Sequence, residues 1–104
     1  MRKKHANGFV SVLEQAGTFA EDKDAARRIR LEHVVPNLSE GKKIVLDFTG
    51  VSVATQSFVH AMVPEALRVH GSRGLELIEF KSCNPTVRSV ILTVVEYSLE
   101  AQKA

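Results

Sequence analysis

The chain has 104 residues, of which 44% are hydrophobic, 25% charged and 6% aromatic, and its formal net charge at pH 7 is +2. This length allows one domain, and the composition is that of a folded globular protein, which excludes a disordered chain. The basic residues are scattered once Arg2, Lys3 and Lys4 are set aside, which argues against a nucleic-acid-binding surface. We therefore predict a flexible basic arm over residues 1–8 and one domain over residues 9–104.

The first half of the chain predicts a strand, a helix and a second strand. Hydrophobic residues predict a short strand over Phe9–Leu13, and Gly17 marks the following turn. Acidic residues begin a predicted helix near Asp22, and Pro36 is expected to end or kink it. The apolar residues at helical spacing in this segment are Leu31, Val34, Val35 and Leu38. The unbroken run Ile44–Leu46 predicts a strand at the centre of a sheet, with both faces covered by helices.

The second half of the chain continues this alternation. An extended stretch after Gly50 leads into a predicted helix over about Gln56–His70, in which Pro64 predicts a kink or a break. The alternating residues of "RGLELIEFK" predict the next strand. Asn84 as N-cap and Pro85 at the first helical position predict the start of the last helix. Together these elements predict an α/β fold, a single small domain with a mixed, mostly parallel sheet of about four strands covered by helices.

The cysteine, histidine and hydropathy patterns exclude several classes of protein. Cys83 is the single cysteine, which excludes an internal disulfide and a zinc site built from cysteines alone. The histidines show no metal-binding spacing, so we expect no metal and no cofactor. No apolar run reaches the roughly 18 residues that span a bilayer, and the N-terminus lacks the apolar core of a signal peptide. We therefore expect a cytoplasmic protein with no membrane contact.

The stretch "KKIVLDFTGVSVATQSFVHAMVPEAL" joins the central predicted strand to the following helix. It resembles the central motif of STAS domains, the fold of bacterial anti-sigma factor antagonists, and is more similar to the STAS-like variant family of uncharacterised function. The variant signature is close to "DF.gV...t.SF", and the matching residues are Asp47, Phe48, Gly50, Val51, Thr55, Ser57 and Phe58. In the main family the helix starts with "D-S-S-G", of which the second serine is retained as Ser57, while Thr55 and Phe58 replace the acid and the glycine.

This resemblance implies a STAS-like fold and a non-catalytic regulatory domain that docks to a partner protein. In many anti-sigma factor antagonists the serine at the place of Ser57 is phosphorylated by a GHKL-type ATPase that is also the anti-sigma factor, and phosphorylation ends the partnership. Ser57 is therefore the phosphoacceptor candidate, and the partner-binding candidates are Thr55, Gln56, Ser57 and Phe58. A phosphate is tolerated there because the first turn of a helix has free N–H groups and the positive end of the helix dipole.

Each of these residues also has a structural interpretation. Thr55 and Ser57 can cap the helix, and Phe58 can pack in the core. Asp47 is expected to anchor a loop by hydrogen bonds, because no second carboxylate accompanies it as an acid–base pair would require. Ser57 and His60 share a helix face, but the sequence has no G-x-S-x-G elbow and no third group of a triad. We therefore predict that the protein is not an enzyme.

Two other functions stay open from the sequence. The predicted helix N-termini at Thr55 and Asn84 can bind a nucleotide or another anion. Alternatively, the domain can form a structural homodimer. Cys83 precedes the last helix, a position that lowers a thiol pKa, although a buried and inert thiol is the commoner case.

Overall fold

The computed structural model describes residues 8–103, except for the side chains of Val69, His70, Ser72 and residues 101–103. Most of the predicted basic arm, residues 1–7, therefore lies outside the described residues. The elements in chain order are β1 (Phe9–Ser11), α1 (Val12–Ala16), β2 (Phe19–Ala20), α2 (Lys23–Ile29), the π-helical segment η1 (Arg30–Val34), α3 (Val35–Ser39), β3 (Ile44–Asp47), β4 (Val53–Ala54), α4 (Gln56–Met62), α5 (Pro64–His70), α6 (Ser72–Glu76), β5 (Ile78–Lys81) and α7 (Pro85–Lys103).

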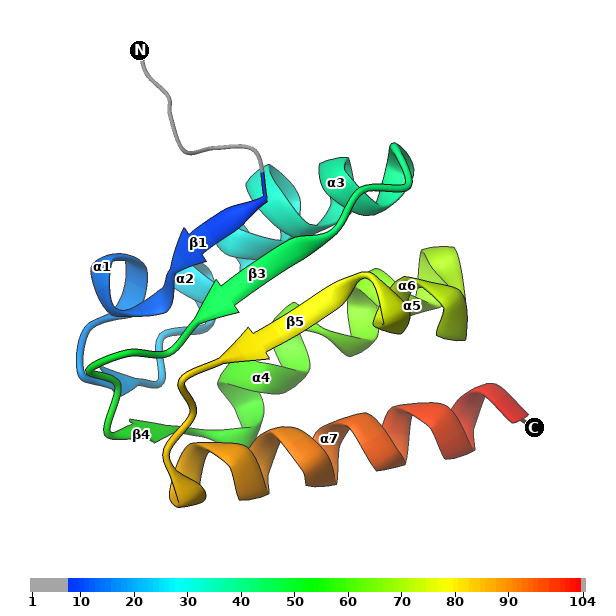
Figure 1. Ribbon diagram of the computed structural model, residues 1–104. Coiled ribbons are helices and arrows are strands. Elements are labelled where there is room, and N and C mark those ends of the chain that lie inside the picture. The colour runs from blue at the N-terminus through cyan, green and yellow to red at the C-terminus, as the bar shows by residue number, and fades with distance from the viewer. Residues whose placement is uncertain (1–7, 104) are drawn as a thin grey trace, which may run out of the picture.

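A parallel sheet with the strand order β1-β3-β5 forms the centre of the fold, and β2 and β4 pair in a second, two-stranded parallel ladder (Figure 1). The residues Val10, Leu46 and Phe80 form one row across the larger sheet. The predicted α/β class with mostly parallel strands is confirmed, with the strands divided into three and two. The predicted central position of the Ile44–Leu46 strand is also confirmed.

The helices cover one face of this sheet. Figure 1 shows α2, α4 and α5 behind the three strands. Burial alternates along β3, where Ile44 and Leu46 have no exposed surface and Val45 is half-buried. Phe9 is 42% exposed and pairs with Val45 on the other face. The prediction that helices cover both faces of this strand is therefore wrong for the described residues. Right-handed crossovers that advance in one direction, from β1 to β3 to β5, place every crossover helix on the same side.

The sequence predicts that the helix after Asp22 ends or kinks at Pro36, but the helical segment continues past the proline to Ser39. Its irregularity lies before the proline, in a π-helical segment where the N–H of Val35 donates to the carbonyl of Arg30, five residues earlier. The extra residue shifts the helical phase by about 100°. Val34 and Leu38 are therefore buried on the same face as the buried residues of α2. Leu31, which is expected on the apolar face, is instead 52% exposed.

The predicted break at Pro64 is confirmed, since α4 ends at Met62 and α5 begins at the proline. Two other predicted bounds are wrong. The first strand ends at Ser11 because the hydroxyl of this residue accepts a hydrogen bond from the N–H of Glu14 and caps α1. The strand predicted for "RGLELIEFK" begins only at Ile78, because the preceding residues form the short helix α6.

The last helix, α7, starts as predicted, with Oδ1 of Asn84 accepting a hydrogen bond of 2.8 Å from the N–H of Val87. Its 19 residues bury the side chains of Val87, Ile91 and Val94 against the core. Figure 1 shows it beside α4, on the β5 side of the sheet. Neither α7 nor any other helix within residues 8–103 has the length and hydropathy that a membrane crossing requires.

The central burial of β3 generates a stability prediction. Leu46→Ala should lower the free energy of unfolding by about 2 to 5 kcal/mol, because it leaves a cavity at a site with no exposed surface. Val45→Ala, one residue away on the open face, is the matched control and should cost clearly less. Urea denaturation of both variants measures the difference, and equal losses would contradict the one-sided burial of the strand.

Candidate functional site

A tight turn connects β3 to the segment that carries the candidate site. The carboxylate of Asp47 accepts hydrogen bonds from the N–H and the hydroxyl of Thr49, at 3.1 and 2.7 Å. The N–H of Val51 donates to the carbonyl of Phe48, which closes the turn. Gly50 has a φ of +83° in this turn, and a Cβ there would lie 2.8 Å from Cδ2 of Leu13. Asp47 thus holds the loop that precedes β4 and α4, as a loop anchor does.

Thr55 is the N-cap of α4, because its hydroxyl accepts a hydrogen bond of 3.1 Å from the N–H of Phe58. Its own N–H donates to the carbonyl of Ala20 in β2. Phe58 has no exposed surface, and neither have Val59 and Met62. Phe58 is therefore a core residue, and its assignment to a partner-binding surface is wrong. The reason is geometric: position 58 lies on the side of α4 that faces the sheet.

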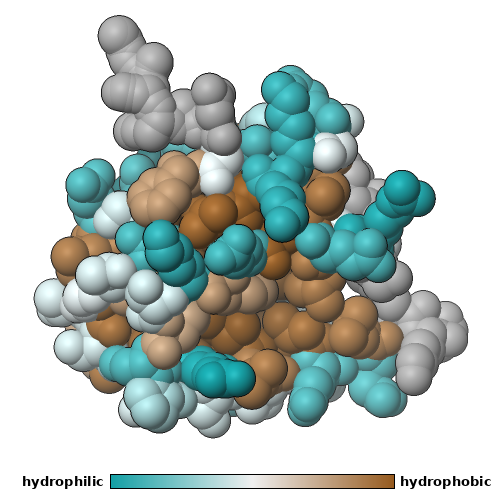
Figure 2. Space-filling model, in the orientation of Figure 1, coloured by the Kyte–Doolittle hydropathy of each residue, from teal (hydrophilic) through white to brown (hydrophobic). Residues whose placement is uncertain are grey.

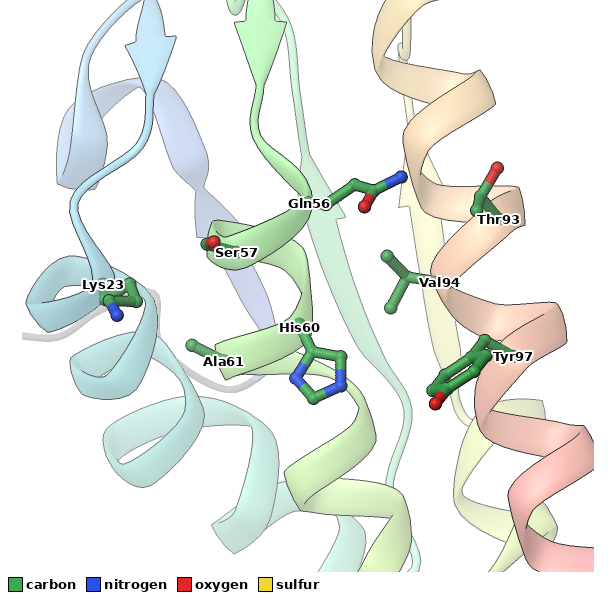
Figure 3. A pocket seen from close by; sticks show the side chains of 8 residues that line it. All are labelled: Lys23, Gln56, Ser57, His60, Ala61, Thr93, Val94 and Tyr97. Atoms are coloured by element: carbon green, nitrogen blue, oxygen red, sulfur yellow. The ribbon is translucent and has the colours of Figure 1, made fainter.

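The opposite face of α4 is open to solvent. Gln56, Ser57 and His60 are all exposed. Within the part of the chain that the structure describes, the Ser57 hydroxyl makes no hydrogen bond, unlike that of Thr55. Figure 3 shows Ser57 on the side of α4 that faces Lys23, and Gln56 on the side that faces α7. The two hydroxyls therefore differ in role: that of Thr55 caps α4, whereas that of Ser57 has no partner among the described residues.

A groove of about 490 Å³ runs along this exposed face, and we call it the α4 groove. Its lining comes from α2, α4 and α7 and consists of Lys23, Gln56, Ser57, His60, Ala61, Thr93, Val94 and Tyr97. Tyr97 is 68% exposed, and His60 and Tyr97 project into the groove from facing helices (Figure 3). Sequence reasoning missed Lys23, Thr93 and Tyr97, since only the folded chain brings them beside Ser57.

Side-chain hydrogen bonds hold the walls of the α4 groove in place. The guanidinium of Arg30 donates to the carbonyl of Ala61 at 2.9 Å and fixes the end of α2 to α4. The amide of Asn84 donates to the carbonyls of Val51 and Ser52, which fixes the start of α7 to the segment before α4. The side-chain oxygen of Asn84 thus caps α7, while its side-chain nitrogen holds this loop.

The lining of the α4 groove combines polar and apolar side chains. Its polar groups are one amine, one amide, three hydroxyls and one imidazole, set around the apolar side chains of Ala61 and Val94. None of the lining residues has a carboxylate. Within residues 8–103, no three His, Cys, Asp or Glu side chains converge as metal ligands. The side chain of His70, the second histidine considered from the sequence, lies outside the described ones.

Cys83 lies apart from the α4 groove, beside a second hollow that Phe80 and Leu92 help to line. Burial raises the pKa of the Cys83 thiol above its usual value; Arg88 lowers it and Asp47 raises it by smaller amounts. The desolvation thus outweighs the favourable position before a helix N-terminus. The structure supports the inert interpretation of this thiol.

Comparison with known proteins identifies one family. A family model described as a STAS-like domain of unknown function matches residues 25–88. This segment runs from α2 to the first turn of α7 and includes β3, the Asp47 turn and the whole of α4. Neither the curated proteins nor the solved structures gave a significant match.

The capping geometry predicts an order of stabilities. Thr55→Ala should lower the free energy of unfolding by about 1 kcal/mol, the usual value of an N-cap. Asn84→Ala should cost more, because it also releases two hydrogen bonds to the loop before α4. Ser57→Ala, the control, should change stability by less than about 0.5 kcal/mol. Urea denaturation checks this order, and a Ser57→Ala loss as large as that of Thr55→Ala would contradict the distinction between the two hydroxyls.

The raised pKa of Cys83 predicts slow thiol chemistry. The thiolate is the reactive form, so raising the pKa lowers its population at neutral pH. Alkylation of the folded protein by iodoacetamide should therefore be slower than alkylation of the same chain in urea, as followed by mass spectrometry. Equal rates in the two states would show that the fold does not protect this thiol.

Proposed function

Because the chain belongs to the family of STAS-like domains of unknown function, we propose that it is a non-catalytic regulatory domain that docks to a partner protein through the α4 groove. The observation that carries this proposal is the polar, exposed face of α4, where Gln56, Ser57 and His60 are free to contact another molecule. The other face of the same helix is fully buried. A partner that binds here contacts side chains of a helix whose opposite face is packed in the core.

Ser57 is the proposed site of regulation. Its hydroxyl is exposed and carries no structural hydrogen bond within the described residues, so a kinase can reach it without unfolding α4. A phosphate adds about 1.5 to 2 negative charges at pH 7 and changes the contact surface of the groove. Lys23, on the neighbouring wall, supplies a positive charge on the same side of α4. Thr55 is unsuited to this role because its hydroxyl caps the helix.

The partner we propose is a GHKL-type ATPase that acts as both kinase and anti-sigma factor. This choice follows from the similarity of the segment from Asp47 to Ser57 to the motif of anti-sigma factor antagonists. It is supported by the exposure of the residue at the phosphoacceptor place. Such a partnership would take place in the bacterial cytoplasm.

A second candidate function is the binding of a small anionic ligand, such as a nucleotide. The volume of the α4 groove, about 490 Å³, falls within the range of small-molecule sites. Lys23 and the hydroxyls could hold a phosphate group while the Tyr97 ring packs against a base. Calorimetric titration with nucleotides separates the two candidates, because a surface that docks only proteins gives no heat of binding when a nucleotide is added.

The docking proposal predicts different behaviour of two Ser57 variants. Ser57→Ala should keep the partner in a pull-down from host lysate, whereas Ser57→Asp should lose it, since the added charge imitates phosphorylation. Ser57→Asp should not destabilise the domain, and a gain of about 0.3 to 1 kcal/mol is expected near the helix N-terminus. Ser89→Asp places the same charge on an exposed part of α7 outside the groove and is the matched control. Mass spectrometry identifies the captured protein, and thermal melting checks the fold.

A GHKL-type ATPase bound by wild type, Ser57→Ala and Ser89→Asp, and absent with Ser57→Asp, is the expected result. Capture of this ATPase by all four proteins to the same extent would remove Ser57 from the contact surface. A heat of binding for a nucleotide, abolished by Lys23→Ala, would favour the second candidate instead.

A further inference from the structure

The strand β5 has an open edge within the part of the chain that the structure describes. It pairs with β3 on one side and has no strand on the other. The carbonyls of Leu77 and Lys81 accept hydrogen bonds from N–H groups at the start of β3 and directly after its end. Because backbone groups alternate along a strand, the N–H and C=O of Ile78 and Phe80 point toward the open edge. Such an edge is a template for pairing with another strand.

An apolar strip lies beside this edge. Figure 2 shows hydrophobic atoms reaching the surface between β5 and α7. A hollow of about 450 Å³ opens there, and its lining includes Phe80, Ile91 and Leu92. Leu92 is 52% exposed, whereas the other valine, isoleucine and leucine side chains of α7 are buried or half-buried. The open edge is therefore flanked by apolar surface that a second molecule can cover.

The charges on β5 favour a second copy of β5 as the pairing strand, and they favour one alignment of the two strands. Glu79 and Lys81 are exposed on the open face of the sheet and carry opposite charges. When β5 pairs antiparallel with a second β5, a two-fold axis at residue 79 or 80 brings three residues of each strand opposite the other copy, whereas an axis at residue 78 or 81 pairs only the end of the strand. An axis at Glu79 or at Lys81 places like charges opposite each other. An axis at Phe80 places Glu79 opposite Lys81 of the other copy twice, which is favourable.

We infer that the protein forms a homodimer by antiparallel pairing of β5 with β5 of a second copy, with the two-fold axis at Phe80 and with the strip beside Leu92 covered in the interface. The ladder is short, because Ser82 has a φ of +59° and ends the strand. The side chain of Lys81 lies over the Phe9 ring, 5.9 Å from its centroid, in a surface contact that a flexible lysine can exchange for Glu79 of the other copy. A short ladder and a small apolar strip give a weak, concentration-dependent dimer.

A charge-reversal cycle on the full chain tests the register. Sedimentation equilibrium over protein concentrations from about 1 μM to 1 mM measures the dissociation constant. Glu79→Lys and Lys81→Glu should each weaken the dimer by about tenfold, because each places like charges opposite each other twice. The double variant Glu79→Lys/Lys81→Glu should restore the wild-type affinity. Melting temperatures confirm that these exposed changes leave the fold intact.

A second pair of variants tests the apolar strip. Leu92→Lys should weaken the dimer by at least about tenfold, since it places a charge in the interface. Leu31→Lys is the matched control, because Leu31 is also 52% exposed but lies on η1, away from β5. A wild-type protein that stays monomeric at every concentration overturns the proposal. A dimer that all of these variants form equally well also overturns it, because its interface is then elsewhere on the molecule.

Discussion

The burial of β3 between two parallel neighbours is the constraint from which the rest of the arrangement follows. Ile44 and Leu46 have no exposed surface, and their removal from water requires β1 and β5 beside them and helices over one face. Parallel neighbours need crossover connections, and right-handed crossovers that advance in one direction put α2 and α4 on the same side. This is why α4 lies between α2 and α7, with one face in the core and the other in contact with solvent.

The position of α4 also depends on an adjustment in the preceding helix. An unbroken α-helix would turn His33 and Asn37 toward the core, because they follow Ile29 at intervals of four residues. The extra residue in η1 brings Val34 and Leu38 to that face instead. The same segment begins with the arginine whose guanidinium reaches the carbonyl of Ala61. The packing of the helix that contains η1 thus helps to hold α4, which forms one wall of the α4 groove.

Features set by a few neighbouring residues could be predicted from the sequence. Thr55 and Asn84 cap helices and Pro64 separates two of them, because each effect depends on local backbone chemistry. The short helices α1 and α6 were missed, since five residues are too few to show a period. The groove was missed because Lys23 and Tyr97 meet α4 only through packing. The family motif pointed to α4, but which face of this helix is exposed is a property of the fold.

The two proposed surfaces lie on different sides of α7. Thr93 and Tyr97 line the α4 groove, whereas Arg88 and Leu92 line the hollow beside β5, and residues four apart share a helix face. A second copy bound at β5 therefore leaves the α4 groove open, and a dimer presents two such grooves. A partner with two sites would bind such a dimer more tightly than a monomer, because its second contact is intramolecular. A charge at Leu92 would then weaken the bivalent complex without touching the groove, whereas a charge at Ser57 would weaken each contact and leave the dimer intact.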